Sequence, residues 1–133
     1  MNEIAIIIEA EINPTENPEK VKLAIENIFG AVEFEVQTRN RGSLLTARTK
    51  GTDGLTKLYN LLRRERIRDA TRAVLFGGLE NDSIIFYLNK QVAFAGHVSF
   101  CESTGESPLG PITVKISCDN PRALIDWLAP RTT

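Results

Sequence analysis

Two stretches with regularly alternating side chains constrain the fold of this chain most strongly. Residues 32–38 read VEFEVQT and residues 112–118 read ITVKISC, so an apolar or small side chain stands at every second position. A repeat of two is typical of a β-strand that buries one face and exposes the other. Both stretches therefore predict half-buried strands, which need other elements to cover their apolar side.

The rest of the chain predicts helices placed among further strands. Apolar residues recur at helical spacing in some segments, and β-branched or aromatic residues concentrate in others. A turn is expected at residues 89–91, and residues 92–96 fit a strand or a short helix equally well. Further strands are expected over 4–12, 44–50, 83–88 and 97–100, and helices over 18–29, 55–62, 69–76 and 121–128.

Polar residues and glycine mark the expected helix ends. Asn17 and Asn120 each precede a proline, the arrangement of an N-cap followed by the first helical residue. Asp69 is expected to cap the third helix. Gly30 is expected to end the first, because glycine adopts the backbone conformation that stops a helix at little cost.

The segment 32–50 is expected to form a hairpin. If residues 40–43 are its loop, Phe34 lies opposite Thr49, Glu33 opposite Lys50, and Glu35 opposite Arg48. Opposite charges that face each other across a hairpin contribute roughly 0.2–1 kcal/mol. The two basic residues of the second strand therefore have a structural role and are left out of any ligand-binding set.

The order of the elements predicts an α+β fold. Hairpin-like connections with helices grouped between them favour a mostly antiparallel sheet. The length of 133 residues is that of one domain. We therefore predict a single domain over residues 1–133 with two layers, a mostly antiparallel sheet and helices packed on one of its faces.

Basic residues concentrate in the middle of the chain. Between Arg39 and Arg72, ten of the 16 Lys and Arg residues accompany three acids, a charge of +7. Residues 1–38 carry −6 and residues 73–133 carry −2, for a total of −1. Such a distribution indicates a surface for an anionic partner, and RNA phosphates are satisfied by several Lys or Arg on one face.

Seven arginines of this segment are the candidate RNA-binding residues. Arginine suits the role because its planar guanidinium binds phosphate oxygens with two hydrogen bonds and stacks on bases. Lys90 is a marginal addition. The seven are Arg39 and Arg41 at the expected hairpin tip, and Arg63, Arg64, Arg66, Arg68 and Arg72 in the helical region that follows.

The sequence offers little for catalysis or for a cofactor. His97 is the one histidine, and no nucleophile-elbow pattern accompanies it. Cys101 and Cys118 do not have the spacing of metal ligands. We therefore predict a protein that is not an enzyme, with no catalytic residues, no metal and no cofactor.

No membrane contact is expected. The longest purely apolar run covers residues 4–8, far short of the roughly 20 residues of a membrane span. No signal peptide is readable at the start of the chain. These features predict a cytoplasmic protein whose two cysteines stay reduced, and a disulfide between them is the alternative.

The most turn-rich stretch covers residues 103–111. Its two glycines in GESPLG stand five apart, as in a phosphate-binding loop, but Pro-Ile follows where that loop has Lys and Ser or Thr. A strand, and not a helix, comes next, so no helix N-terminus faces a phosphate. A pocket lined by this stretch would be the basis of an enzyme, a third function that the sequence leaves open.

Three strings of residues resemble a known family. They are SIIFYLNKQ from Ser83, GESPLGPI from Gly105 and DWLAP from Asp126. They are similar to strings in a small archaeal family of cytosolic proteins that are predicted to bind RNA. The similarity covers essentially the whole chain. It implies a fold like that of the large-subunit ribosomal protein that binds five-S ribosomal RNA, and a role accessory to archaeal RNA processing, associated with the exosome.

A protein assembly module is the alternative to an RNA-binding domain. The net charge of −1 favours it, because a dedicated RNA-binding protein is usually basic overall. Such a module would form a homodimer by pairing its acidic and basic surfaces or by pairing a sheet edge.

Overall fold

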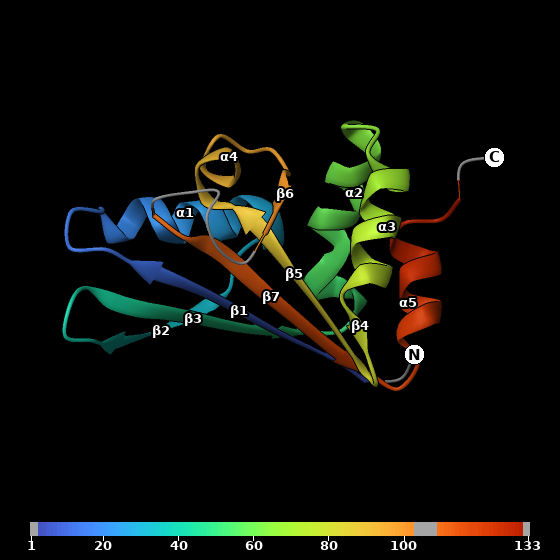
Figure 1. Cartoon of the computed structure of the whole chain (residues 1–133), viewed down its shortest axis with the longest axis horizontal. Helices are drawn as coiled ribbons and strands as arrows, with labels where there is room; N and C mark the ends of the chain where they lie inside the picture. The colour runs from blue at the N-terminus through green and yellow to red at the C-terminus, as the bar shows by residue number, and fades with distance from the viewer. Residues whose placement is uncertain (1–2, 103–108, 132–133) are drawn as a thin grey trace.

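The computed structural model describes residues 3–102 and 109–131, in which seven strands form one sheet. All neighbouring strands run antiparallel, in the order β2-β3-β1-β7-β5-β4, and β6 pairs with β5 beside β4 (Figure 1). The predicted α+β class with an antiparallel sheet is confirmed. The strands are β1 (Ile4–Ile12), β2 (Glu33–Thr38), β3 (Ser43–Lys50), β4 (Leu79–Glu80), β5 (Ser83–Asn89), β6 (Phe100–Cys101) and β7 (Pro111–Cys118).

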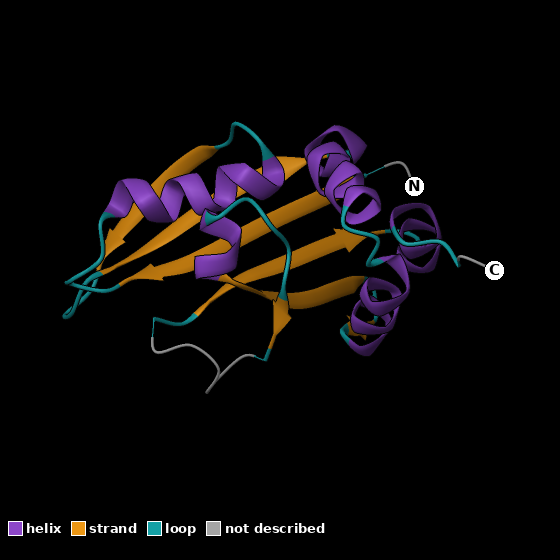
Figure 2. Ribbon diagram, turned by 90° about the horizontal axis from the view of Figure 1, so that it is seen from above, coloured by secondary structure: helices purple, strands orange, loops and turns teal. Residues whose placement is uncertain are grey.

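The helices pack over one face of this sheet. Figure 2 shows them on the near side, with one group over the middle of the strands and another group at one end. The first group is α1 (Pro18–Phe29) with α4 (Lys90–Phe94). The second is α2 (Thr56–Arg64), preceded by a 3-10 turn (Thr52–Leu55), together with α3 (Arg68–Gly77) and α5 (Pro121–Leu128).

Alternation along the strands gives the sheet its apolar face. In β1 the side chains of Ile4, Ile6 and Ile8 are buried, and they meet buried residues of β7 such as Ile116 and Val114 in the pairing register. Burying an isoleucine side chain contributes about 1.5–3 kcal/mol. The other face of the sheet is more accessible and mixes apolar with charged side chains. It follows that the core lies between the sheet and the helices.

The predicted helix ends are mostly confirmed. The Asn17 side chain accepts a 2.9 Å hydrogen bond from the Glu19 amide, and the Asn120 side chain accepts one from the Ala123 amide. Gly30 follows α1 with a positive φ of 83°. The prediction for Asp69 is wrong by position, because α3 already begins at Arg68 and Asp69 lies in its first turn.

The predicted hairpin register is wrong by two residues. Phe34 pairs with Ala47, and Glu33 pairs with Arg48, because the loop covers residues 39–42 and Thr38 closes the hairpin opposite Ser43. Gly42 has a φ of +74°, a conformation that glycine adopts at no steric cost. The shift of two keeps every side chain on its predicted face. Arg48 still forms a 3.5 Å ion pair with Glu35, now along the diagonal.

The segment 89–101 differs most from expectation. Residues 90–94 form a helix, which replaces the turn expected at 89–91 and decides for the helix among the two alternatives at 92–96. The Asn89 side chain caps it by accepting a hydrogen bond from the Val92 amide. The strand expected at 97–100 shrinks to Phe100–Cys101, and the short β4 was not anticipated. A helix of five residues is too short to show a periodic pattern, and its one signal in the sequence, Asn89 at the cap, was assigned to a turn.

Within the described ranges, no helix combines the length and the apolar composition that crossing a membrane requires.

Candidate nucleic-acid interface

The structure divides the seven candidate arginines among three places. Figure 1 shows the β2–β3 connection at the left end of the molecule and the α2–α3 turn at the top of the helical group on the right. Arg39 and Arg41 belong to the first place, and Arg64, Arg66 and Arg68 belong to the second. Arg63 and Arg72 turn towards α5. The candidates therefore do not form one continuous surface.

Arg63 holds the end of α5 against α2. Its guanidinium lies 3.3 Å from the centre of the Tyr59 ring and donates to the carbonyls of Trp127 and Leu128, each at 3.3 Å. The Tyr59 ring in turn stacks on Trp127 with ring centroids 4.8 Å apart. Carbonyls at a helix C-terminus have no partner within the helix and attract cations. The contacts of Arg63 are therefore structural.

Arg72 makes the corresponding contact from α3. It forms a 2.8 Å ion pair with Asp126, donates to the Ala129 carbonyl at 3.2 Å, and lies 5.0 Å from the centre of the Phe76 ring. Only 17% of its side chain is exposed. The two arginines satisfy carbonyls at the same helix end. This structural role accounts for Arg63 and Arg72 without any contact to RNA.

The α2–α3 turn gathers the three arginines that remain in the helical region. Arg64 ends α2, Arg66 lies in the turn with a φ of 57°, and Arg68 begins α3. Arg64 and Arg66 are exposed, and Arg68 is half-buried. Across residues 3–102 and 109–131, no carboxylate or carbonyl binds their guanidinium groups. These side chains are therefore available to an anion.

Glu65, the acid of this turn, points to a neighbouring segment. Its carboxylate accepts hydrogen bonds from the Val98 amide at 3.2 Å and contacts His97 Nδ1 at 3.2 Å. Its negative charge is thus held on the 97–98 side of the turn. His97 is exposed and lies outside any strand, which corrects its predicted position.

The hairpin tip is the second free basic site. Arg39 and Arg41 are exposed, and no ion pair involves either side chain in the described part of the chain. The tip is fixed at its base, where the Arg39 amide donates to the Gly42 carbonyl at 3.1 Å. Two arginines at the end of a long hairpin can reach an extended ligand away from the body of the protein.

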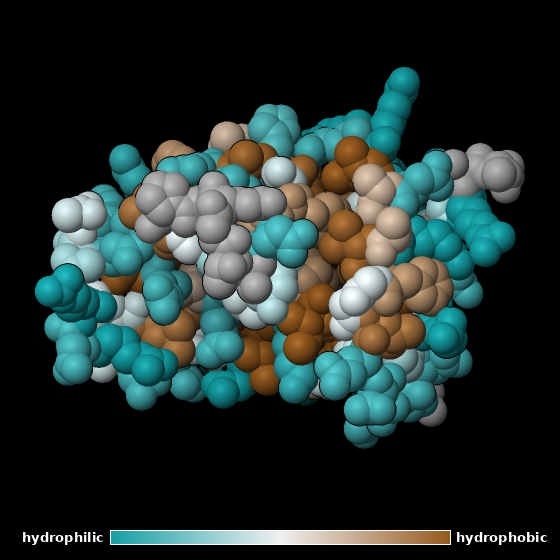
Figure 3. Space-filling view, viewed as in Figure 1, coloured by the Kyte–Doolittle hydropathy of each residue, from teal (hydrophilic) through white to brown (hydrophobic). Residues whose placement is uncertain are grey.

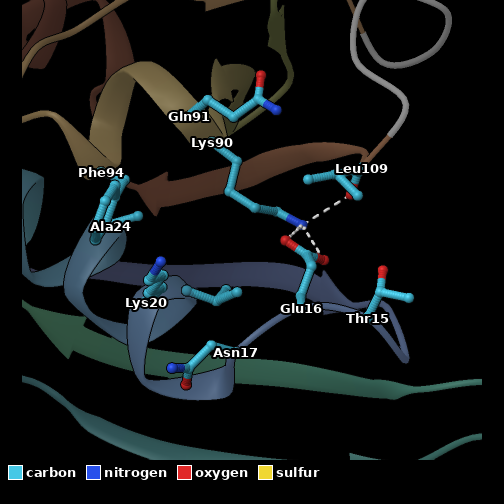
Figure 4. Close-up of a pocket in the computed structure, with 10 residues that line it drawn as sticks. Thr15, Glu16, Asn17, Lys20, Ala24, Lys90, Gln91, Phe94 and Leu109 are labelled. Atoms are coloured by element: carbon cyan, nitrogen blue, oxygen red, sulfur yellow. Dashed lines mark hydrogen bonds and ion pairs between the residues drawn. The ribbon is translucent and has the colours of Figure 1, made fainter.

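The marginal candidate Lys90 is wrong, because its side chain is buried. Its ammonium donates to the Leu109 carbonyl at 2.8 Å and pairs with Glu16 at 3.1 Å (Figure 4). It also donates to the Glu11 carbonyl at 2.7 Å. Glu16 also accepts from the backbone and side-chain nitrogens of Asn13. Sequence reasoning missed this network, and the position of Lys90 directly after the N-cap Asn89 was the one available hint.

This buried pair lines a pocket of about 330 Å³ between α1 and α4. Ala24 and Phe94 form part of its apolar wall, and Lys20 lies 5.7 Å from the centre of the Phe94 ring. Binding pockets usually combine an apolar lining with a few convergent polar groups. Here the buried charges already satisfy each other, so the pocket gives the enzyme alternative no support. The GESPLG stretch of that alternative lies largely outside the described residues.

Cysteine, histidine and acidic residues do not assemble into a metal site in the described ranges, where no group of three or more such side chains is close enough to hold an ion. Cys118 is buried, and its burial raises the pKa of the thiol above its ordinary value. A thiol in this state is a poor nucleophile.

Comparisons with known proteins define the family. A family model described as RNA binding matches residues 5–118. A UPF0201 protein of Metallosphaera sedula is 41% identical over 96% of this chain and 89% of its own length. A UPF0201 protein of Thermococcus kodakarensis is 46% identical over 94% of this chain and 88% of its own length. The chain belongs to the UPF0201 family.

A solved structure agrees with this assignment. The crystal structure of a UPF0201 protein from Methanococcus jannaschii matches with a TM-score of 0.86 at 38% identity and covers 97% of this chain and 95% of that protein. The expected archaeal family with a predicted RNA-binding role is thereby confirmed. The likeness to the ribosomal protein that binds five-S RNA stays a prediction, because this crystal structure and a second UPF0201 crystal structure at 32% identity carry family names alone.

Proposed function

We propose that this UPF0201 member is a non-enzymatic RNA-binding domain that contacts phosphates through the α2–α3 turn. The observation that carries the proposal is the group of Arg64, Arg66 and Arg68, which lies within five residues and binds no other group of the described chain. The family model described as RNA binding supports the class of ligand. We refer to these three residues as the arginine turn.

The local backbone favours an anion at this place. Arg68 is the first residue of α3, and a helix N-terminus carries a partial positive charge that attracts phosphate. Arg66 turns the chain between the two helices, so the three arginines stand at the end of α2, in the turn and at the start of α3. A single strand of RNA that crosses the turn would meet several donors without the need for base-specific contacts.

Arg39 and Arg41 enter the proposal as a second, separate contact. β3 alone spans eight residues, and a strand rises about 3.3 Å per residue, so the tip and the turn lie tens of ångströms apart. Only an extended or folded RNA would reach both places. The proposal therefore rests on the arginine turn, and the tip adds to affinity for longer ligands.

The test is RNA binding across a salt series, with single-stranded and duplex RNA. The proposal predicts that log affinity falls linearly with log salt concentration, because each phosphate contact of the protein releases cations from the RNA and added salt opposes this release. Replacement of Arg64, Arg66 and Arg68 by Gln removes up to three contacts, and the slope for a single strand should then become less steep by about 2. No binding by the wild-type protein at low salt would refute the proposal.

A matched variant controls for total charge. Arg122 is an exposed arginine of α5 that lies 5.6 Å from the Phe76 ring, away from the arginine turn. Arg122→Gln removes one positive charge and should leave the salt slope unchanged. An equal loss of RNA affinity for Arg122→Gln and for Arg66→Gln would mean that the protein attracts RNA by its overall charge alone.

The resemblance in the sequence supports two narrower parts of the proposal. We propose a cytoplasmic role accessory to archaeal RNA processing, in association with the exosome. Capture of exosome subunits from an archaeal extract by wild-type protein, with and without nuclease treatment, tests this role. Capture that is lost after nuclease treatment would make RNA the bridge and remove a direct association.

A second candidate function is protein assembly through a homodimer. The observation that favours it is the free edge of β2, which has β3 on one side and no strand on the other in the described sheet. In solution, a mass near twice 14.8 kDa would support assembly. A monomer at every protein and salt concentration would exclude it.

A further inference from the structure

β2 is an edge strand that has no proline, lysine or bulge, and its charged side chains are Glu33 and Glu35. Natural edge strands often carry a proline, a lysine or a bulge. β2 reads EFEVQT, and its register with β3 runs without interruption from Glu33 to Thr38. Its side chains are almost all exposed, and Val36 is 55% exposed. The strand is therefore able to accept another strand along its whole length.

The opposite edge of the sheet is covered. β4 and β6 both pair with β5, and between them the Ile85 amide donates to the Gly78 carbonyl at 3.0 Å. A groove beside them is lined by residues that include Val74, Ile85 and Phe100. Figure 3 shows hydrophobic residues gathered at the centre of this side of the molecule. Among the described strands, β2 thus offers the one long open edge.

Two hydrogen bonds fix which backbone groups of β2 point outward. The Arg39 amide donates to the Gly42 carbonyl, and the Gly51 amide donates to the Ile4 carbonyl. Because hydrogen-bonded pairs alternate with non-bonded pairs in an antiparallel ladder, both bonds imply that residues 33, 35 and 37 bind β3. The N–H and C=O groups of Phe34, Val36 and Thr38 therefore face the open edge.

The charges of this edge are unevenly paired. Glu35 forms its 3.5 Å ion pair with Arg48. No cation of the described chain lies within 4.0 Å of the Glu33 carboxylate, and no carboxylate lies that close to the Arg39 guanidinium. Glu33 stands at the start of β2 and Arg39 directly after its end. One acid and one base thus remain at the two ends of the same strand.

We propose that two copies of this chain form a homodimer in which the β2 strands pair antiparallel about a two-fold axis at Val36. In this register Val36 lies opposite its own copy, and Phe34 lies opposite Thr38 of the second copy. The three outward-facing residues then supply all the hydrogen-bonded pairs. Glu33 comes to lie opposite Arg39 of the second copy, and the symmetry repeats the pair at the other end.

The register makes the edge selective for its own copy. Glu33 and Arg39 would form a non-hydrogen-bonded pair, in which Cα atoms lie about 4.5 Å apart and side chains are close. Opposite charges in this position are favourable, and like charges are not. Glu33 and Glu35 would repel an acidic or unmatched strand. The exposed Val36 side chains of the two copies would cover each other on the helix side of the sheet.

The inference rests on the assembly candidate and is independent of RNA binding by the arginine turn. It uses Arg39, so in the dimer Arg41 alone would remain at each tip for RNA. A protein that dimerises without binding RNA, or that binds RNA as a monomer, would separate the two proposals.

Charge-swap variants test the register by sedimentation equilibrium. Glu33→Arg places two arginines opposite each other, and Arg39→Glu places two glutamates opposite each other, so each variant should weaken dimerisation at least fivefold. The double variant Glu33→Arg/Arg39→Glu restores the pair in reverse and should dimerise like wild type. Recovery in the double variant is not expected from any other interface. A wild-type monomer, or single variants that dimerise normally, would overturn the proposal.

A disulfide test reports the position of the two-fold axis directly. In a hydrogen-bonded pair the Cα atoms lie about 5.5 Å apart, within the range of a disulfide. Val36→Cys should therefore give a covalent dimer under mild oxidation. Gln37→Cys is the matched control, because residue 37 lies two positions away from its own copy. The wild-type protein, oxidised in the same way, shows whether Cys101 or Cys118 forms a disulfide between copies. Equal cross-linking of both variants, or none, would overturn the two-fold axis at Val36.

Discussion

Arg72 and Asp126 form an ion pair of 2.8 Å between α3 and the last turn of α5. The same guanidinium donates to the Ala129 carbonyl beyond the helix end. Together with Arg63 on α2, which donates to Trp127 and Leu128, this contact attaches the last helix to the two helices before it. Two arginines from the basic stretch of the sequence thus bind the protein's own carbonyls.

This division predicts that stability and RNA affinity respond to different arginines. Arg72→Ala should lower the free energy of unfolding by about 1.5–3 kcal/mol, because it removes hydrogen bonds from a charged donor. Arg66→Ala should change stability by less than about 0.5 kcal/mol, as expected for an exposed position. Urea unfolding of both variants, beside RNA binding at low salt, measures the two effects.

The opposite pattern of effects would contradict the assignment. If Arg72→Ala weakened RNA binding at a temperature where the variant is fully folded, Arg72 would belong to the interface. If Arg66→Ala lost as much stability as Arg72→Ala, the arginine turn would be a structural element as well.

The buried pair of Lys90 and Glu16 gives a second prediction. The two side chains are 4% and 10% exposed. Removing one partner of a buried pair leaves the other charge without compensation, which costs about 3–5 kcal/mol. Lys90→Met should therefore destabilise the protein strongly in urea unfolding. Lys22→Met is the control, because Lys22 pairs with Glu19 at the surface and should cost less than about 1 kcal/mol.

Adjacent glycines at the end of α3 provide a third prediction. A Cβ atom on Gly78 would lie 1.9 Å from the Ile85 carbonyl oxygen, whereas a Cβ atom on Gly77 would meet nothing within 4 Å. Gly78→Ala must separate α3 from β5 and should destabilise the protein by more than about 2 kcal/mol. Gly77→Ala should be neutral or stabilising by up to about 1 kcal/mol, because alanine is favoured in a helix. Thermal unfolding of the two variants measures this difference. Equal shifts of the melting temperature would contradict the close packing of Gly78 against β5.

The fold was largely predictable, since its strands carry alternating patterns and the helices α1 and α5 carry side-chain caps. Asn17 and Asn120 cap helices as predicted. The hairpin register was wrong because the loop fits the sequence at residues 39–42 and at residues 40–43, and these two overlapping placements have similar composition. Only the backbone conformation of Gly42 distinguishes them. Sequence patterns locate a strand and its faces better than they locate its partners.

The candidate site was less predictable, because the positions of charged residues in a sequence do not show where their side chains point in the folded protein. Arg63 and Arg64 are neighbours, but one reaches α5 and the other stays exposed. The difference depends on carbonyls of residues 127 and 128, which are distant in the sequence. Lys90 was misjudged for the same reason, since its partners Glu11 and Leu109 come from two other parts of the chain.

The buried thiol of Cys118 gives the last prediction. Burial raises its pKa above the ordinary value of 9.0, so the folded protein holds the thiol proton more tightly than the unfolded chain. As the pH rises above about 9, the unfolded chain loses this proton first, and the free energy of unfolding falls. Urea unfolding between pH 8 and pH 11 should show this decline in wild type, and the decline should be smaller in Cys118→Ala.

Cys101 supplies the control for this effect, because it is only half-buried. Cys101→Ala should keep the wild-type slope above pH 9. At pH 8 a thiol reagent should modify Cys101 in the folded protein well before Cys118, and denaturant should equalise the two rates. If Cys118 reacted as fast as Cys101 in the folded state, the end of β7 would open readily, and the raised pKa would have no basis in burial.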